Sequence, residues 1–196
     1  MRDRALAIWQ EAQDPHGTIV ERYLASRRLD LPEETGADVL RFHPACPFGN
    51  DRLPCMVAVY RTIDRDLPVA VHRTALSANG QKIGRKMLGP VAGAAIKLDA
   101  DADVTMGLVV GEGIETTLTA RQLGFRPAWA LGSVGAIAAF SVLSGIEALT
   151  ILAEAGKPSA DAVQICGQRW SEAGREVIVV SPRMGADIND ALRGAA

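Results

Sequence analysis

The sequence predicts an α/β protein in two parts: a small α+β subdomain over residues 1–103 and a parallel sheet flanked by helices over residues 104–196. Before the acidic and polar segment Lys97–Asp103, apolar runs are separated by turn signals, which is typical of antiparallel strands. After this segment, short apolar runs alternate with helical patterns, which indicates parallel strands covered by helices on both faces. We interpret the segment itself as a linker.

Composition restricts the function classes. With 196 residues, 48% of them hydrophobic, the chain can bury a core, and its net charge of −2 provides no global basic field for nucleic acid. The three cysteines lack CxxC spacing, which excludes a structural zinc site and favours free thiols. No apolar run reaches the roughly 18 residues of a membrane span, and Met1–Leu24 carries charges throughout. We therefore expect a cytoplasmic protein with no membrane partner.

Two helices are expected at the start of the N-terminal part. The first has one apolar face, and the second starts at Thr18, which forms a capping box pattern with Glu21. The following segment Leu31–Arg52 is rich in Pro, Gly and polar residues, so we expect irregular structure there.

Three antiparallel strands are then predicted over Met56–Tyr60, Val69–Leu76 and Lys82–Leu88, with Asn79 and Gly80 as a hairpin turn. These strands carry the cations Arg73, Lys82, Arg85 and Lys86. Such a group is either a solvated face or a local patch that holds a phosphate backbone.

The C-terminal part alternates strictly between the two kinds of element. Strands are predicted over Leu108–Val110, Ala128–Leu131, Ala148–Ala153 and Val177–Val180. Helices are predicted over Ile114–Leu123, Ala136–Phe140 and Ser159–Ala173, with a last helix that ends at Arg193.

The stretch LVVGEGIETT, Leu108–Thr117, places Glu112 between two glycines at the carboxyl end of a strand. Ligands bind at this edge of open α/β sheets, and glycines allow close approach to the backbone. The alternatives are a dinucleotide loop, although GxGxxG lacks its third glycine here, and a solvated Glu.

Further acids follow the later strands: Glu154 after one, and Asp187 and Asp190 after another. Acids on one sheet edge are able to converge and bind Mg²⁺ or Mn²⁺ together with substrate phosphates. Asp187 has an alternative role as the cap of the last helix.

The order of these motifs resembles the Toprim domain over Leu108–Arg193. More closely, GEGIETTLTA, PAWALGSVGAIAAF, GIEALTILAE and DINDAL are similar to Toprim-type, DnaG-like primases of phages, plasmids and integrative elements. The N-terminal stretches GTIVERYL, LRFHP, MVAVYRT, AVHRTAL and KMLGPVAGAAIKL resemble the segment that precedes Toprim in those proteins.

The resemblance implies a bound divalent metal, Mg²⁺ or Mn²⁺, and nucleotidyl transfer on a DNA template during DNA replication. By position, Glu112 matches the Toprim glutamate, an acid, base or metal ligand. Glu154 matches the first acid of the DxD motif, and Asp187 with Asp190 match the last acidic group. The chain departs from the pattern at Gly156, where the second Asp of DxD would stand. We expect metal affinity to be weak and Gly156→Asp to raise it.

We therefore predict a metal-dependent, primase-like nucleotidyltransferase core that acts on single-stranded DNA and nucleotides. Its acids hold the metal, and Arg73, Lys82, Arg85 and Lys86 contact phosphate. A degenerate Toprim module that binds without catalysis and a Toprim nuclease remain as alternatives. Primases of this kind usually have a zinc ribbon before this region and often a helicase after it. The sequence has neither, so we expect either an excised fragment of a longer protein or a stand-alone protein that depends on partners such as a helicase or another replication protein.

Overall fold

A computed structural model describes residues 1–32 and 38–194. The chain forms two compact units, Met1–Ile96 and Lys97–Ala196, whereas the sequence placed a boundary between residues 103 and 104. Each unit is described by itself. Part of the segment expected to be irregular, residues 33–37, lies outside the described residues.

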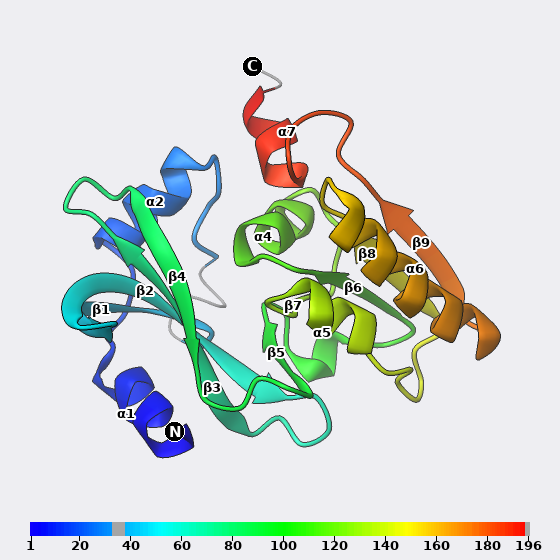
Figure 1. Ribbon diagram of the computed structural model, residues 1–196, viewed down its shortest axis with the longest axis horizontal. Coiled ribbons are helices and arrows are strands. Elements are labelled where there is room, and N and C mark those ends of the chain that lie inside the picture. Colours follow the sequence, from blue (N-terminus) through cyan, green and yellow to red (C-terminus); the bar gives the residue numbers. More distant parts are fainter. Residues whose placement is uncertain (33–37, 195–196) are drawn as a thin grey trace. The chain divides into compact units, whose positions relative to one another are not determined.

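The first unit contains two helices and an antiparallel sheet (Figure 1). Strand β2 pairs with β1, β3 and β5, and β4 adds to the far side of β3. The helices are α1 (Arg2–Glu11) and α2 (Ile19–Ser26). The strands are β1 (Leu40–Phe48), β2 (Asp51–Thr62), β3 (Pro68–Leu76), β4 (Lys82–Leu88) and β5 (Ala94–Lys97). The three predicted strands and the hairpin at Asn79 and Gly80 are confirmed.

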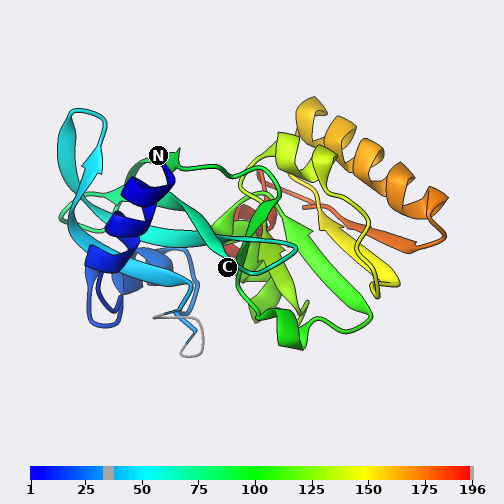
Figure 2. The same cartoon turned by 90° about the horizontal axis from the view of Figure 1, so that it is seen from below.

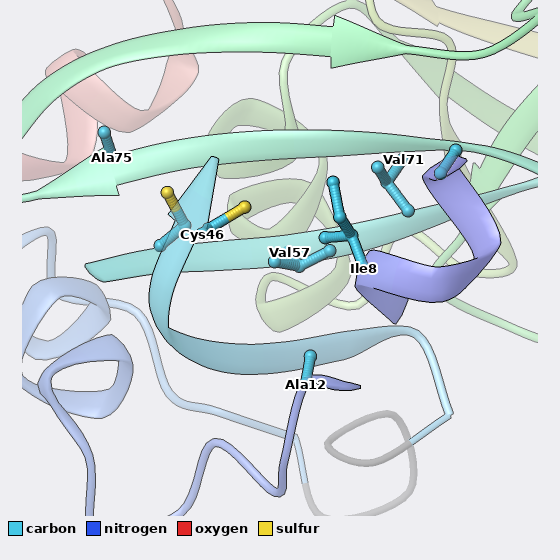
Figure 3. Close-up of a cluster of buried hydrophobic side chains, with 8 residues drawn as sticks. Ile8, Ala12, Cys46, Val57, Val71 and Ala75 are labelled. Carbon is cyan, nitrogen blue, oxygen red and sulfur yellow. The ribbon is translucent and has the colours of Figure 1, made fainter. Parts of the chain in front are cut away.

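Helix α1 covers one face of this sheet. Its buried residues Ala5 and Ile8 pack against Val57 of β2 and Val71 of β3 (Figure 3). Helix α2 contacts β3 as well, and its Leu24 is fully buried. Successive strand residues point to opposite faces, so burial on both faces explains why β2 and β3 have continuous buried runs rather than alternating ones.

Strand β1 corrects the sequence prediction, which expected irregular structure from Leu31 to Arg52. Its residues pair with β2, and the register shifts between His43 and Cys46, around Pro44. A proline supplies no N–H for the ladder, so it weakens the local strand signal. The capping box at Thr18 is also altered, because Glu21 accepts from the Gly17 N–H rather than from Thr18.

The second unit has four parallel strands in the order β7-β6-β8-β9. These are β6 (Gly107–Gly111), β7 (Ala128–Ala130), β8 (Ala148–Leu152) and β9 (Glu176–Val180). The helices are α4 (Ile114–Gln122), α5 (Val134–Ala139), α6 (Lys157–Glu172) and α7 (Ile188–Gly194), with a 3₁₀ turn, η1 (Asp101–Asp103), before β6. The predicted parallel sheet flanked by helices is confirmed.

Helices cover both faces of this parallel sheet. Helices α5 and α6 lie together on one side of the strands (Figure 2), where Phe140 stacks on Trp170 with ring centroids 5.8 Å apart. A second cluster joins Val109 and Leu152 of the strands to Ala120 of α4 and Ile188 of α7. In the described residues, no helix is long and apolar enough to span a membrane.

The segment Lys97–Asp103, predicted as a linker, is packed into the second unit. Asp99 is almost fully buried and accepts hydrogen bonds from Arg121 Nε at 3.0 Å, Arg126 Nε at 2.9 Å and the Ala128 N–H at 2.9 Å. The buried Lys97 ammonium lies 4.8 Å from the ring centroid of Trp129 and 2.7 Å from an Asp101 carboxylate oxygen. The pattern of apolar residues in a sequence does not reveal that charged side chains such as these are buried.

Candidate functional site

The parallel strands of the second unit end together. Gly111 of β6 is in register with Ala130 of β7 and Leu152 of β8, and Leu152 is in register with Val180 of β9. The predicted acidic residues Glu112, Glu154 and Asp187 all follow these strand ends. The topology therefore brings them to one edge of the sheet.

Two glycines on this edge have close neighbours. A Cβ atom added at Gly111 would stand 2.5 Å from Thr117 Oγ1 and 3.1 Å from Leu152 Cδ1, so helix α4 and β8 require a glycine there. A Cβ atom added at Gly113 would stand 3.7 Å from Glu154 Oε1 and 3.8 Å from an oxygen of Glu115. Two carboxylates from different elements thus approach the backbone at Gly113.

Glu115 is a candidate site residue that sequence reasoning missed. It belongs to the first turn of α4, and 6% of its surface is exposed. Residues from Ile114 to Ala120 are all buried, so the helix shows no alternation that would mark the direction of the Glu115 side chain. The available signal was a carboxylate within a run of apolar and small residues.

Glu154 is held by one residue of α4 and one residue of α6. Thr116 Oγ1 lies 3.4 Å from Glu154 Oε1, and the Glu154 N–H donates to Ser159 Oγ at 2.9 Å. Glu112 is half-buried, and its carbonyl oxygen accepts from the Gly132 N–H at 2.8 Å, which fixes the backbone beside β7.

The turn before α7 uses its acids for its own structure. Asp187 Oδ1 accepts from the Asp190 N–H at 2.8 Å, so Asp187 caps α7, as the alternative interpretation of the sequence expected. The Ala186 N–H lies 3.4 Å from Asp190 Oδ2. The Ala155 N–H donates to Ala186 O at 2.7 Å and connects this turn to the loop that carries Glu154.

The carboxylates of the second unit offer a metal ion only part of its ligands. Among residues 1–32 and 38–194, no group of three or more His, Cys, Asp or Glu side chains is able to enclose an ion. Mg²⁺, however, commonly binds one or two carboxylates and completes its shell with water and substrate phosphates. The two carboxylates beside Gly113, from Glu115 and Glu154, fit an open site of this kind.

The predicted basic residues differ in exposure. Lys82, Arg85 and Lys86, here called the β4 cations, are exposed on β4, and the Lys86 ammonium lies 4.9 Å from the ring centroid of Phe48. Neighbouring strand residues alternate between faces, so Arg85 and Lys86 point to opposite sides of β4.

Arg73, the fourth predicted cation, is 7% exposed and donates to Pro47 O at 2.5 Å and Met87 O at 3.2 Å. A hydrogen bond from Cys55, together with the positive charge of Arg73, lowers the pKa of the buried Cys46. Arg73 thus stabilises the interior of the first unit.

Comparison with solved structures identifies the fold. The primase fragment of the bacteriophage T7 primase-helicase protein is 20% identical, with a TM-score of 0.64 over 87% of this chain and 68% of that one. A DNA primase domain from Pseudomonas aeruginosa is 14% identical, with a TM-score of 0.65 over 99% and 74%. A DnaG primase catalytic domain bound to ssDNA is 14% identical, with a TM-score of 0.63 over 98% and 74%. The chain has a Toprim, DnaG-like primase fold.

Family models cover both units. Residues 107–196 match the model described as Toprim domain. Residues 1–98, half of the chain, match the model described as Domain of unknown function (DUF7146), and the chain belongs to this family. None of the curated proteins compared with this chain matches it.

Proposed function

We propose that the protein is a metal-dependent, primase-like nucleotidyltransferase core that acts on a single-stranded DNA template in the cytoplasm. The observation that carries the proposal is the approach of Glu154 and Glu115 to Gly113 at the strand ends of a Toprim fold. Mg²⁺ or Mn²⁺ is the proposed cofactor, because carboxylate oxygens suit these hard ions.

In the proposed reaction, a 3′ hydroxyl attacks the α-phosphate of a nucleotide, a phosphodiester bond forms and pyrophosphate leaves. A bound divalent ion would offset phosphate charge during this step. Glu154 and Glu115 would hold the ion, and Thr116 keeps Glu154 in place through its hydroxyl. Glu112, which follows β6 on the same edge, is the proposed acid or base for the hydroxyl proton. Asp187 and Asp190 would shape the neighbouring turn and add negative charge.

The β4 cations are the proposed contact with the template, because exposed Lys and Arg side chains bind phosphate without sequence preference. Arg73 is left out of this role because its guanidinium is buried and bonded to two carbonyl groups. A helicase is a proposed partner, since the T7 protein with the same fold is a primase-helicase.

A single assay tests the proposed chemistry. The protein is incubated with single-stranded DNA, labelled nucleotides and Mg²⁺ or Mn²⁺, and the products are sized on a gel. New oligomers that disappear in Glu154→Gln support the proposal. Glu147→Gln is the matched control, because Glu147 is exposed and precedes the same strand, β8, at its opposite end.

Two other outcomes would overturn this proposal. Shortened template would indicate a Toprim nuclease that uses the same acids with water as nucleophile. Binding of DNA without any product would indicate a degenerate module. Gly156 favours the degenerate module, because the position of the second DxD acid has no carboxylate.

A further inference from the structure

Asn189 lies in the first turn of α7, between the two acids Asp187 and Asp190, and has no assigned role in the reaction. It is fully buried, and its Nδ2 donates to Thr119 Oγ1 of α4 at 3.0 Å, across 70 positions of sequence. An exposed helix end seldom buries an amide side chain, since burial of such a group costs stability unless it is hydrogen-bonded.

The hydroxyl of Thr119 continues this contact toward the carboxylate site. Thr119 is fully buried, and its Oγ1 donates to the Glu115 carbonyl oxygen at 2.9 Å while it accepts from Asn189. Thr119 thus uses both its donor and its acceptor capacity in one connected path from α7 to the first turn of α4. That turn carries Glu115, whose carboxylate approaches Gly113.

The turn that precedes α7 and carries Asp187 is attached to the Glu154 loop by the hydrogen bond from the Ala155 N–H to Ala186 O. A movement of α7 along α4 would therefore displace both the Asp187 turn and the loop that carries Glu154. Apolar contacts of Ile188 hold α7 on the sheet but tolerate sliding, whereas a buried hydrogen bond has one register.

We propose that Asn189 is a positioning residue that fixes the acid-bearing turn against α4 and thereby sets the spacing of Glu154 and Glu115. The inference rests on the proposed function for its effect on the reaction, although not for the structural coupling itself. Asn189 acts through Thr119 and Ala186 and contacts no substrate in this role.

Two substitutions remove the bond from its two ends. Asn189→Leu removes the amide, and Thr119→Val replaces the hydroxyl with a methyl group of similar shape. We expect each to weaken Mn²⁺ binding at least tenfold by calorimetry and to lower kcat at saturating Mn²⁺. The double variant should lose no more than either single variant. Thr119→Ser keeps the hydroxyl, so its Mn²⁺ affinity should lie within about twofold of that of the unchanged protein.

A matched control separates positioning from general loss of stability. Cys166→Ala removes a fully buried sulfur between α6 and α5, on the other face of the sheet. This variant should unfold at lower urea concentration and bind Mn²⁺ as the unchanged protein does. An equal loss of Mn²⁺ affinity in Cys166→Ala would overturn the inference, as would unchanged affinity in folded Asn189→Leu.

Amide hydrogen exchange without metal keeps this test independent of the proposed function. In Asn189→Leu, the N–H groups of Ala155 and Asp190 should exchange at least ten times faster, whereas that of Ala160 in α6 should not change. Equal exchange at all three would refute the coupling. If the unchanged protein binds no Mn²⁺, the proposed metal chemistry fails, and this exchange measurement alone decides the role of Asn189.

Discussion

Gly156 should be needed for full stability of the second unit although it is exposed. It precedes α6 with φ of 107° and ψ of 158°, a region of backbone space open essentially to glycine alone. A Cβ atom there would meet Pro158 Cδ at 3.8 Å, an ordinary contact. The cost of a side chain is therefore backbone strain and not steric overlap.

The expected loss for Gly156→Asp is about 1–3 kcal/mol in the free energy of unfolding. An aspartate before a helix usually stabilises it by about 1 kcal/mol, but that gain requires an extended backbone with negative φ. For a unit of about 100 residues, each kcal/mol changes the melting temperature by about 4–8 °C. Exposed positions without such strain usually change stability by less than about 0.5 kcal/mol.

Urea denaturation followed by circular dichroism measures this loss, with Ala155→Asp as the control. Ala155 is exposed, is adjacent to Gly156 and has no positive φ. The Ala155→Asp variant therefore adds the same charge as Gly156→Asp without the backbone strain. We expect the control to stay within about 0.5 kcal/mol of the unchanged protein. Equal stability of the two variants would refute the strain argument.

Calorimetry on folded Gly156→Asp tests the DxD alignment as well. Among the described residues outside its immediate neighbours, only Pro158 Cδ lies within 4 Å of the added Cβ position, so an aspartate side chain there has room to extend, and we expect it to tighten Mg²⁺ binding. Unchanged affinity in the folded variant would show that position 156 does not face the metal and would contradict the DxD alignment.

Three further changes test other parts of the structure. Gly111→Ala should cost about 1–3 kcal/mol through overlap with Thr117, and a second substitution, Thr117→Ala, should recover part of it in urea denaturation; additive losses would contradict this contact. Replacing the β4 cations by Gln should reduce the slope of log affinity against log salt for single-stranded DNA by about 1, measured by fluorescence anisotropy, because Arg85 and Lys86 point to opposite sides of β4. Arg65→Gln, at an exposed turn, is its control, and an unchanged slope would make the β4 cations a solvated face. Burial raises the pKa of Cys166 from 9.0 to about 11, so its contribution to stability is complete below pH 9 and is lost between pH 9 and 11. Urea denaturation between pH 9 and 11 should show a smaller loss of unfolding free energy in Cys166→Ala than in the unchanged protein. An equal loss in the two proteins would contradict the assignment of this pH dependence to Cys166.

The parallel unit could be predicted from sequence because its signals are local. Its strands are buried on both faces and appear as short apolar runs, so β8 was expected at Ala148–Ala153 and lies at Ala148–Leu152. Strand β1 was missed because it depends on pairing with β2 and contains Pro44 and Pro47. The burial of Asp99 was missed because it depends on two arginines more than 20 residues away.

The location of the site was predictable for the same reason, while its side-chain directions were not. Strand order and polarity alone place Glu112, Glu154 and Asp187 on one edge, whatever their rotamers. The approach of Glu115 to Gly113 depends on the rotation of α4, and α4 is buried on so many sides that no polar stripe marks that rotation. Asp187 could equally face the site or cap α7, and the cap is what the structure shows. A motif aligned by sequence order therefore identifies which loops meet, whereas the packing of α4 and α7 decides which of their carboxylates face each other. The test of Asn189 and Thr119 addresses that packing directly.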